Sequence, residues 1–97
     1  MKTLQEIKCA LSPVLPNMAL KYKLRDMGIF GSYVKNTQTE ESDVDILVDF
    51  EEPPSLFEFV GLKNELSDVL NCNVDVVMKS ALKPHIGKRI VEEAILL

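Results

Sequence analysis

The stretch "DVDILVDF", residues 43–50, places acidic side chains inside an otherwise apolar run. Its Val, Ile and Leu residues are typical of a buried strand. Side chains alternate between the two faces of a strand, so the even-numbered apolar residues share one face and Asp43 and Asp45 share the other. The run therefore predicts a strand with one face in the core and a pair of carboxylates on the opposite face.

A second strand pattern carries one more acid. It is "NVDVVM", residues 73–78, in which Asp75 stands among β-branched residues. If the two strands pair, facing Cβ atoms lie about 4.5–5.5 Å apart, and Asp43, Asp45 and Asp75 converge. Ionised carboxylates at that spacing repel one another, whereas Mg²⁺ binds such oxygens together with substrate phosphates. Taken alone, the same pattern also fits acids on a solvated strand face.

The pair Gly31-Ser32 precedes the first two acids, with ten residues between Ser32 and Asp43. Gly31 ends a short predicted strand, "MGIFG", and Ser32 is expected to open a short helix. Free backbone N–H groups at a helix start, a serine hydroxyl and a glycine that permits close approach together suit a phosphate group. A lone Gly-Ser also fits an ordinary turn, but beside the carboxylates it predicts a phosphate site.

The remaining patterns predict an α/β (α+β) chain with a small mixed sheet covered by helices. Thr3 with Glu6 and Ser55 with Glu58 read as capping boxes that open helices. A second helix is expected from Ser12, as its cap, to about Leu24, with Gly28 in the turn that follows it. The predicted order is α-α-β-β-α-β-α, and the last helix begins near Pro84. Residues 1–97 are expected to form a single domain.

The amino-acid composition and charge argue against several kinds of function. The formal charge is −4 and no basic run occurs, which argues against non-specific binding of nucleic acid. Cys9 and Cys72 match no metal-binding spacing, so free thiols in a reducing compartment are expected. No eighteen-residue apolar run and no signal-peptide pattern occur, which predicts a cytoplasmic protein without a membrane segment. The sequence leaves homo-oligomerisation open.

The acids and the Gly-Ser pair resemble the signature of the nucleotidyltransferases of the DNA polymerase β superfamily. That signature is Gly-Ser, then Asp-x-Asp, then a third acid on a later strand, matched here by Gly31, Ser32, Asp43, Asp45 and Asp75. Within the superfamily, the chain is most similar to the minimal nucleotidyltransferases of prokaryotes, which are typically encoded beside an all-helical HEPN protein. The likeness spans nearly the whole chain and implies the polymerase β-like nucleotidyltransferase fold.

The resemblance implies a reaction and a partner. ATP would bind with its phosphates over Gly31 and Ser32, and a hydroxyl would attack the α-phosphorus while pyrophosphate leaves. A pair of Mg²⁺ ions is implied, with Asp43 and Asp45 binding both and Asp75 binding the one nearer the attacking oxygen. In related antitoxins the acceptor is a tyrosine of a HEPN ribonuclease toxin, which AMP transfer silences. The alternative is an antitoxin that inhibits its partner by occlusion, without catalysis.

One departure from the resemblance concerns the residues after Gly-Ser. Many relatives carry Arg-Gly there, whereas this chain has Lys35-Asn36. Asparagine tolerates positive φ better than most residues, so the turn is expected to survive. Lysine keeps the positive charge but lacks the two-pronged geometry of arginine. The departure therefore bears on catalytic efficiency or partner contact more than on metal binding.

Overall fold

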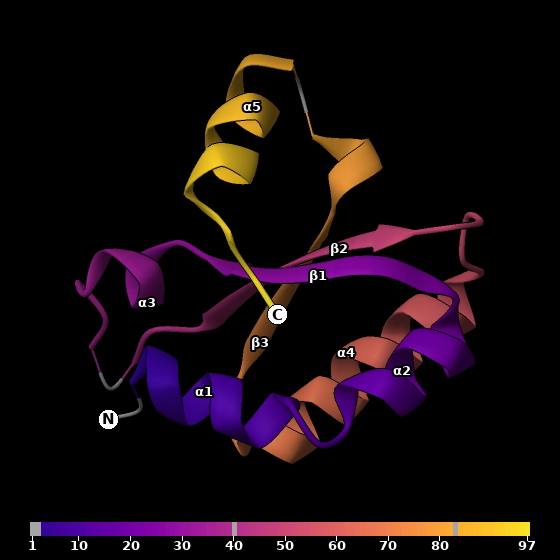
Figure 1. Cartoon of the computed structure of the whole chain (residues 1–97), viewed down its shortest axis with the longest axis horizontal. Helices are drawn as coiled ribbons and strands as arrows, with labels where there is room; N and C mark the ends of the chain where they lie inside the picture. Colours follow the sequence, from indigo (N-terminus) through magenta and orange to yellow (C-terminus); the bar gives the residue numbers. More distant parts are fainter. Residues whose placement is uncertain (1–2, 40, 83) are drawn as a thin grey trace.

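A four-stranded mixed sheet organises the molecule, in the order β3-β2-β1-β4 (Figure 1). It is seen in a computed structural model that describes residues 3–39, 41–82 and 84–97. β1 is antiparallel to both β2 and β4, and β2 is parallel to β3. The strands are β1 (Leu24–Phe30), β2 (Val44–Phe50), β3 (Val74–Met78) and β4 (Ile95–Leu96). The predicted fold class, a small mixed sheet with helices, is confirmed.

Helices cover the two faces of the sheet unequally. Three lie together on one face, and α5 lies over the other, as Figure 1 shows. The first group is α1 (Leu4–Leu11), α2 (Leu15–Tyr22) and α4 (Leu56–Leu70). The single turn α3 (Ser32–Lys35) follows β1, the 3₁₀ turn η1 (Lys79–Ala81) follows β3, and α5 spans Pro84–Glu93. No helix within the described ranges has the length and apolarity needed to cross a bilayer.

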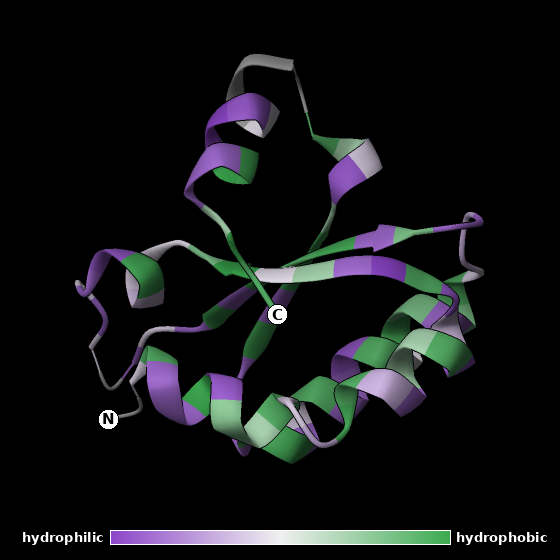
Figure 2. Ribbon diagram, in the orientation of Figure 1, coloured by the Kyte–Doolittle hydropathy of each residue, from purple (hydrophilic) through white to green (hydrophobic). Residues whose placement is uncertain are grey.

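The hydrophobic core lies between the sheet and the group of three helices. Val44, Ile46 and Val48, the apolar face predicted for β2, are fully buried there. Their partners across the interface include Ile7 of α1 and Leu62 of α4. Figure 2 shows apolar residues along these helices and along the strands. The core therefore fixes the orientation of β2 and leaves its alternate residues, including Asp45, on the α5 side.

Two predicted boundaries around the second helix are wrong. Ser12 ends α1 instead of capping the next helix, which begins at Leu15 without a side-chain cap. At its other end, α2 stops at Tyr22 because Lys23 takes a left-handed conformation, with φ 55° and ψ 51°. Strand β1 then begins at Leu24, three residues earlier than predicted. A lysine at the left-handed C-cap is unusual, since glycine or asparagine is preferred there, which explains the error.

Gly28 consequently lies inside β1 and not in a turn. A Cβ atom at this position would stand 3.1 Å from the backbone oxygen of Ile95 in β4. Gly28 faces Leu96 and Ile29 faces Ile95 in the antiparallel register of this pair. The glycine therefore allows the close approach of β4, and Ile95 and Leu96 form an added edge strand.

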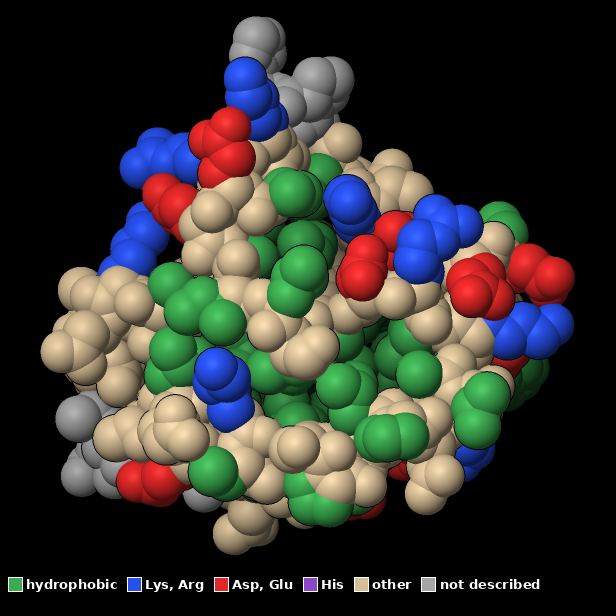
Figure 3. Space-filling view, in the orientation of Figure 1, with side chains coloured by type: hydrophobic (Ala, Val, Ile, Leu, Met, Phe, Trp, Pro, Cys, Tyr) green, Lys and Arg blue, Asp and Glu red, His purple; other side chains and the backbone are tan. Residues whose placement is uncertain are grey.

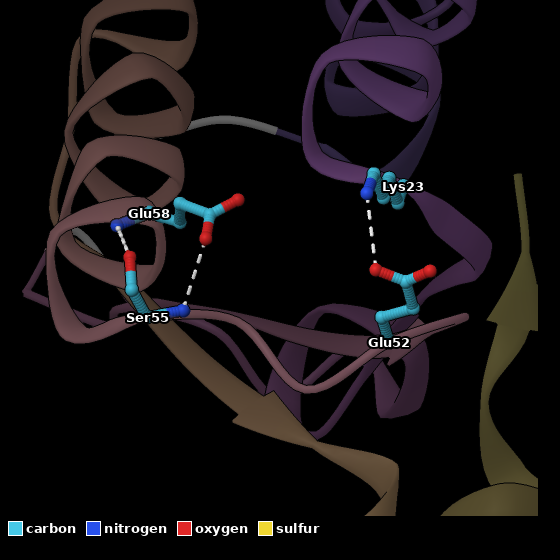
Figure 4. Close-up of polar contacts among 4 residues, drawn as sticks. All are labelled: Lys23, Glu52, Ser55 and Glu58. Carbon is cyan, nitrogen blue, oxygen red and sulfur yellow. Dashed lines mark hydrogen bonds and ion pairs between the residues drawn. The ribbon is translucent and has the colours of Figure 1, made fainter.

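The capping box predicted at the start of α4 is present, as Figure 4 shows. The Ser55 hydroxyl accepts from the Glu58 backbone N–H at 3.1 Å, and the Glu58 carboxylate accepts from the Ser55 backbone N–H at 3.1 Å. These bonds hold the pKa of Glu58 below its usual value. Both satisfy N–H groups that the helix itself leaves without partners.

We expect Ser55→Ala to lower the free energy of unfolding by about 1 kcal/mol, because it removes one of these cap bonds. Urea denaturation followed by circular dichroism measures this, with the exposed Ser80→Ala as the matched control. Equal stability of the two variants would contradict the assigned role of the cap. Nucleotide transfer should be the same in both, since neither serine lies near the predicted site.

Candidate active site

Asp45 and Asp75 face each other directly across two neighbouring strands. The parallel register of β2 and β3 pairs Val44 with Val74 and Asp45 with Asp75. Asp43 lies one residue before β2 and is exposed. The structure thus pairs Asp45 with Asp75 and places Asp43 just before β2, at the end of the sheet where β2 and β3 begin.

Burial and the neighbouring acids shift the pKa of the Asp45 carboxyl. Partial burial raises the pKa of the Asp45 carboxyl, and the negative charges of Asp75 and then Asp43 raise it further. All three effects disfavour the ionised form. A bound cation would reverse that balance, because an opposite charge nearby favours the carboxylate. The charges of both Asp75 and Asp43 therefore act on the Asp45 carboxyl.

Gly31 contacts the same carboxylate from the neighbouring strand. Phe30, the last residue of β1, faces Asp45 in the antiparallel register, so Gly31 leaves the sheet beside it. Its backbone has φ 78° and ψ −145°, a conformation almost restricted to glycine. A Cβ atom there would stand 2.2 Å from Oδ2 of Asp45. Both the backbone and the lack of space require glycine at this position.

Ser32 opens the single turn α3, as predicted, with Gly31 as its N-cap. The Gly31 carbonyl accepts from the backbone N–H groups of Val34 and Lys35, each at 3.1 Å. Asn36 closes the turn with φ 59°, so the tolerance of asparagine for positive φ is used as expected. Ser32 is thereby held next to Gly31, at the same end of the sheet as Asp45. We call Gly31 and Ser32 the Gly-Ser turn.

Tyr33 packs beneath α3 and does not line an open pocket. Its side chain is 5% exposed and belongs to the hydrophobic core. Burial raises the pKa of the Tyr33 hydroxyl, and the nearby groups Cys72 and Asp43 add to this. The tyrosine therefore anchors the inner side of α3.

The acids of the site match a divalent cation in the type of their donor atoms. Asp43, Asp45 and Asp75 offer only carboxylate oxygens, the donor type preferred by Mg²⁺, and Gly31 leaves free the space beside Asp45 that a side chain would fill. Among the described residues, no three His, Cys, Asp or Glu side chains stand close enough to form a ready-made metal site. Repulsion between the acids opposes closer approach. The residues fit the ion, and their roles as ligands stay predictions.

The sequence pattern did not reveal the residue that forms an ion pair with Lys35. The Lys35 ammonium forms an ion pair with Glu93 at the end of α5, with 3.4 Å between Nζ and Oε2. Nothing in the local pattern marks Glu93, because the pair joins residues distant in the sequence. Of the basic residues near the chain end, Lys79, Lys88 and Arg89 are exposed, as a solvated face would be, and Lys83 lies outside the described residues.

Comparisons with known proteins show the family of the chain. The family model described as a nucleotidyltransferase domain matches residues 14–97. The protein adenylyltransferase MntA of Thermococcus cleftensis is 45% identical over 95 residues, which cover 98% of this chain and 96% of that protein.

Two solved structures extend the comparison. One, described as a minimal nucleotidyltransferase, has a TM-score of 0.86 and 30% identity, and the match covers 99% of this chain and 97% of the other. The second is the MNT antitoxin complex with the tri-AMPylated HEPN toxin of Shewanella oneidensis. It matches with a TM-score of 0.67 and 18% identity over 93% of this chain and 70% of that chain. The second likeness shows the fold alone.

Proposed function

Because the chain belongs to the nucleotidyltransferase domain family, and within it to the minimal nucleotidyltransferases, we propose that it transfers AMP from ATP to a hydroxyl of a partner protein. The reaction requires Mg²⁺, held by Asp43, Asp45 and Asp75. The partner is a HEPN-type toxin, and the modification makes this chain its antitoxin. The name of the Thermococcus relative and the AMPylated toxin in the Shewanella complex support this choice of substrate and partner.

One observation carries the proposal. Asp45 is paired with Asp75 across the sheet and has Gly31 against its carboxylate, so an acid pair and the Gly-Ser turn adjoin at one point. A structural role alone offers no reason to place two like charges opposite each other, since facing like charges destabilise a sheet. The phosphate groups of a substrate would bind at the Gly-Ser turn, and their cation would bind at the acid pair.

The protein residues have separate tasks in this reaction. The Gly-Ser turn would hold the triphosphate through its backbone N–H groups and the Ser32 hydroxyl, and the three aspartates would hold the cation. The acceptor oxygen bonds to the α-phosphorus as the bond to the β-phosphate oxygen breaks, and pyrophosphate leaves. Asp75 takes the acceptor's proton. Bound Mg²⁺ would supply charge neutralisation at the phosphate oxygens.

Labelled ATP tests the proposal. The chain is mixed with Mg²⁺, its HEPN partner and ATP labelled at either the α- or the γ-phosphate, and label on the partner is measured. Transfer of AMP predicts label from α-labelled ATP only, and its loss with Asp43→Asn or with a chelator. Label from γ-labelled ATP would contradict the reaction. Full inhibition of the toxin by Asp43→Asn, without label, would favour inhibition by occlusion instead.

Ser32→Ala is expected to lower kcat/KM for transfer by about ten- to a hundredfold, because a hydrogen bond to a charged group contributes about 1.5–3 kcal/mol. The reason is the loss of one donor to the triphosphate. The exposed Ser12→Ala, on the helix side of the sheet, serves as the matched control and should keep full activity. Wild-type activity in Ser32→Ala would remove Ser32 from the site.

A further inference from the structure

The turn α3 is too short to hold its own position. It contains only the four residues Ser32–Lys35. A single helical turn is unstable in isolation, because its nucleation cost is not recovered by further hydrogen bonds. Its placement therefore depends on contacts with the rest of the chain. Tyr33 supplies the buried contact on the inner side, and Lys35 supplies the ion pair on the outer side.

Glu93, the last residue of α5, binds two cations at once. Its Oε2 lies 3.4 Å from Nζ of Lys35, and its Oε1 lies 3.4 Å from Nε of Arg89 one turn earlier on α5. Desolvation would raise the pKa of Glu93, but the hydrogen bonds from Arg89 and Lys35 outweigh it and hold this pKa below its usual value. Figure 3 shows acidic and basic side chains side by side at the upper left, where α5 lies above α3.

The Gly-Ser turn and Asp45 have little room to move relative to each other. Gly31, the N-cap of α3, lies so close to Asp45 that one added carbon would overlap its carboxylate. A shift of α3 by a fraction of an ångström therefore changes the spacing between the Gly-Ser turn and Asp45. Binding sites lose efficiency when such spacings depart from the productive geometry by about 0.5 Å.

From these contacts we propose that Glu93 is a positioning residue for nucleotide binding: through Lys35 it fixes α3, and with it the Gly-Ser turn, beside Asp45. The inference rests on the proposed function and names a residue that acts on the same site from another element. Lys35 then serves as the link between α5 and α3. Lysine supplies the single positive charge that this pair with Glu93 requires.

Glu93→Gln provides the first test. The dissociation constant for AMP-PNP with Mg²⁺ should rise about two- to fivefold, the range expected for a partly exposed ion pair, and KM for ATP should rise in parallel. The matched control is Glu52→Gln, which breaks an ion pair with Lys23 at 3.0 Å near the start of α4 (Figure 4). It should leave nucleotide affinity unchanged. An unchanged affinity in Glu93→Gln, or an equal loss in both variants, would overturn the proposal.

Exchanging the charges of Lys35 and Glu93 shows whether Lys35 positions α3 or binds the phosphates directly. Lys35→Glu and Glu93→Lys are combined in an Arg89→Gln background, so that the introduced lysine does not face the arginine that pairs with Glu93. Each single exchange should weaken AMP-PNP binding by about tenfold, since it replaces attraction with repulsion. The combined exchange should restore affinity to within about twofold of Arg89→Gln alone. Affinity that stays low would show that Lys35 acts on the phosphates directly, and would overturn the role given to Glu93.

The binding readout also separates this inference from the proposed function. If the wild-type chain binds AMP-PNP but labels no partner, the transfer proposal fails and the comparison of Glu93→Gln with Glu52→Gln still decides the role of Glu93. If the wild type binds no nucleotide, both proposals fail. Melting temperatures of all variants are measured beside the affinities, because a purely structural ion pair would lower the melting temperature and leave the affinity of the folded chain unchanged.

Discussion

Asp45→Asn is expected to lower nucleotide transfer by about a thousandfold and to leave the fold intact. The substitution removes the charge of the carboxylate that faces Asp75 and adjoins Gly31, and so removes a proposed ligand of the cation. Asparagine has nearly the same shape, so packing is retained. The measurement is kcat/KM for AMP transfer, with Asp68→Asn, an exposed acid on α4, as the matched control.

The same variant should be at least as stable as the wild type when no divalent cation is bound. The pKa of Asp45 in the folded chain is raised by burial and by the neighbouring acids. The folded state therefore binds a proton more readily than the unfolded state, and stability from this group falls as pH rises through the raised pKa. Without a divalent cation, Asp45→Asn should melt at or above the wild-type temperature at pH 7, and this difference should shrink as the pH falls toward 4. A large fall in melting temperature would contradict the account.

Gly31→Ala is expected to lower transfer by about a hundredfold, because misplacement of groups by about 1 Å is enough for such a loss. The new Cβ atom would overlap Oδ2 of Asp45, so either the carboxylate or α3 must move. The backbone conformation adds a cost of about 1–3 kcal/mol in the free energy of unfolding, since non-glycine residues disfavour it. Both kcat/KM and urea denaturation should therefore show the change.

A second glycine gives the control for this prediction. Gly61 lies in α4, where a Cβ atom would meet the Tyr22 hydroxyl at 3.2 Å, a tight contact with a side-chain atom away from the site. Gly61→Ala should keep full transfer activity, and the gain in helix propensity of about 1 kcal/mol opposes the cost of the contact. Equal activity of Gly31→Ala and Gly61→Ala would mean that the space beside Asp45 has no functional role.

The sequence predicted the strand β2 and its two faces correctly because the pattern is governed by alternation alone. Apolar residues at 44, 46 and 48 had to share the core face, which left Asp45 on the other. The capping box of α4 was equally predictable, since Ser55 and Glu58 interact within one turn. Alternation and capping depend on residues close together in the sequence, and both can therefore be predicted from the sequence alone.

Features set by tertiary contact could not be predicted in this way. The end of α2 depends on a left-handed lysine, Lys23, which no composition rule marks, and so Gly28 was placed in a turn instead of a strand. The approach of β4 to Gly28 and the ion pair of Lys35 with Glu93 join distant residues. The candidate acids were found by their spacing, but the direct pairing of Asp45 with Asp75 required the register of β2 and β3.

Paramagnetic broadening by Mn²⁺ tests most directly whether the acids and the Gly-Ser turn form one cation site. Mn²⁺ shares the preference of Mg²⁺ for carboxylate oxygens, and substoichiometric amounts can be added to the ¹⁵N-labelled chain with AMP-PNP. The account predicts that the amide signals of Gly31, Ser32, Asp45 and Asp75 broaden first and together, and that those of the first turn of α4 stay sharp. First broadening near Glu51 and Glu58, with the signals of Asp45 and Asp75 unaffected, would contradict it.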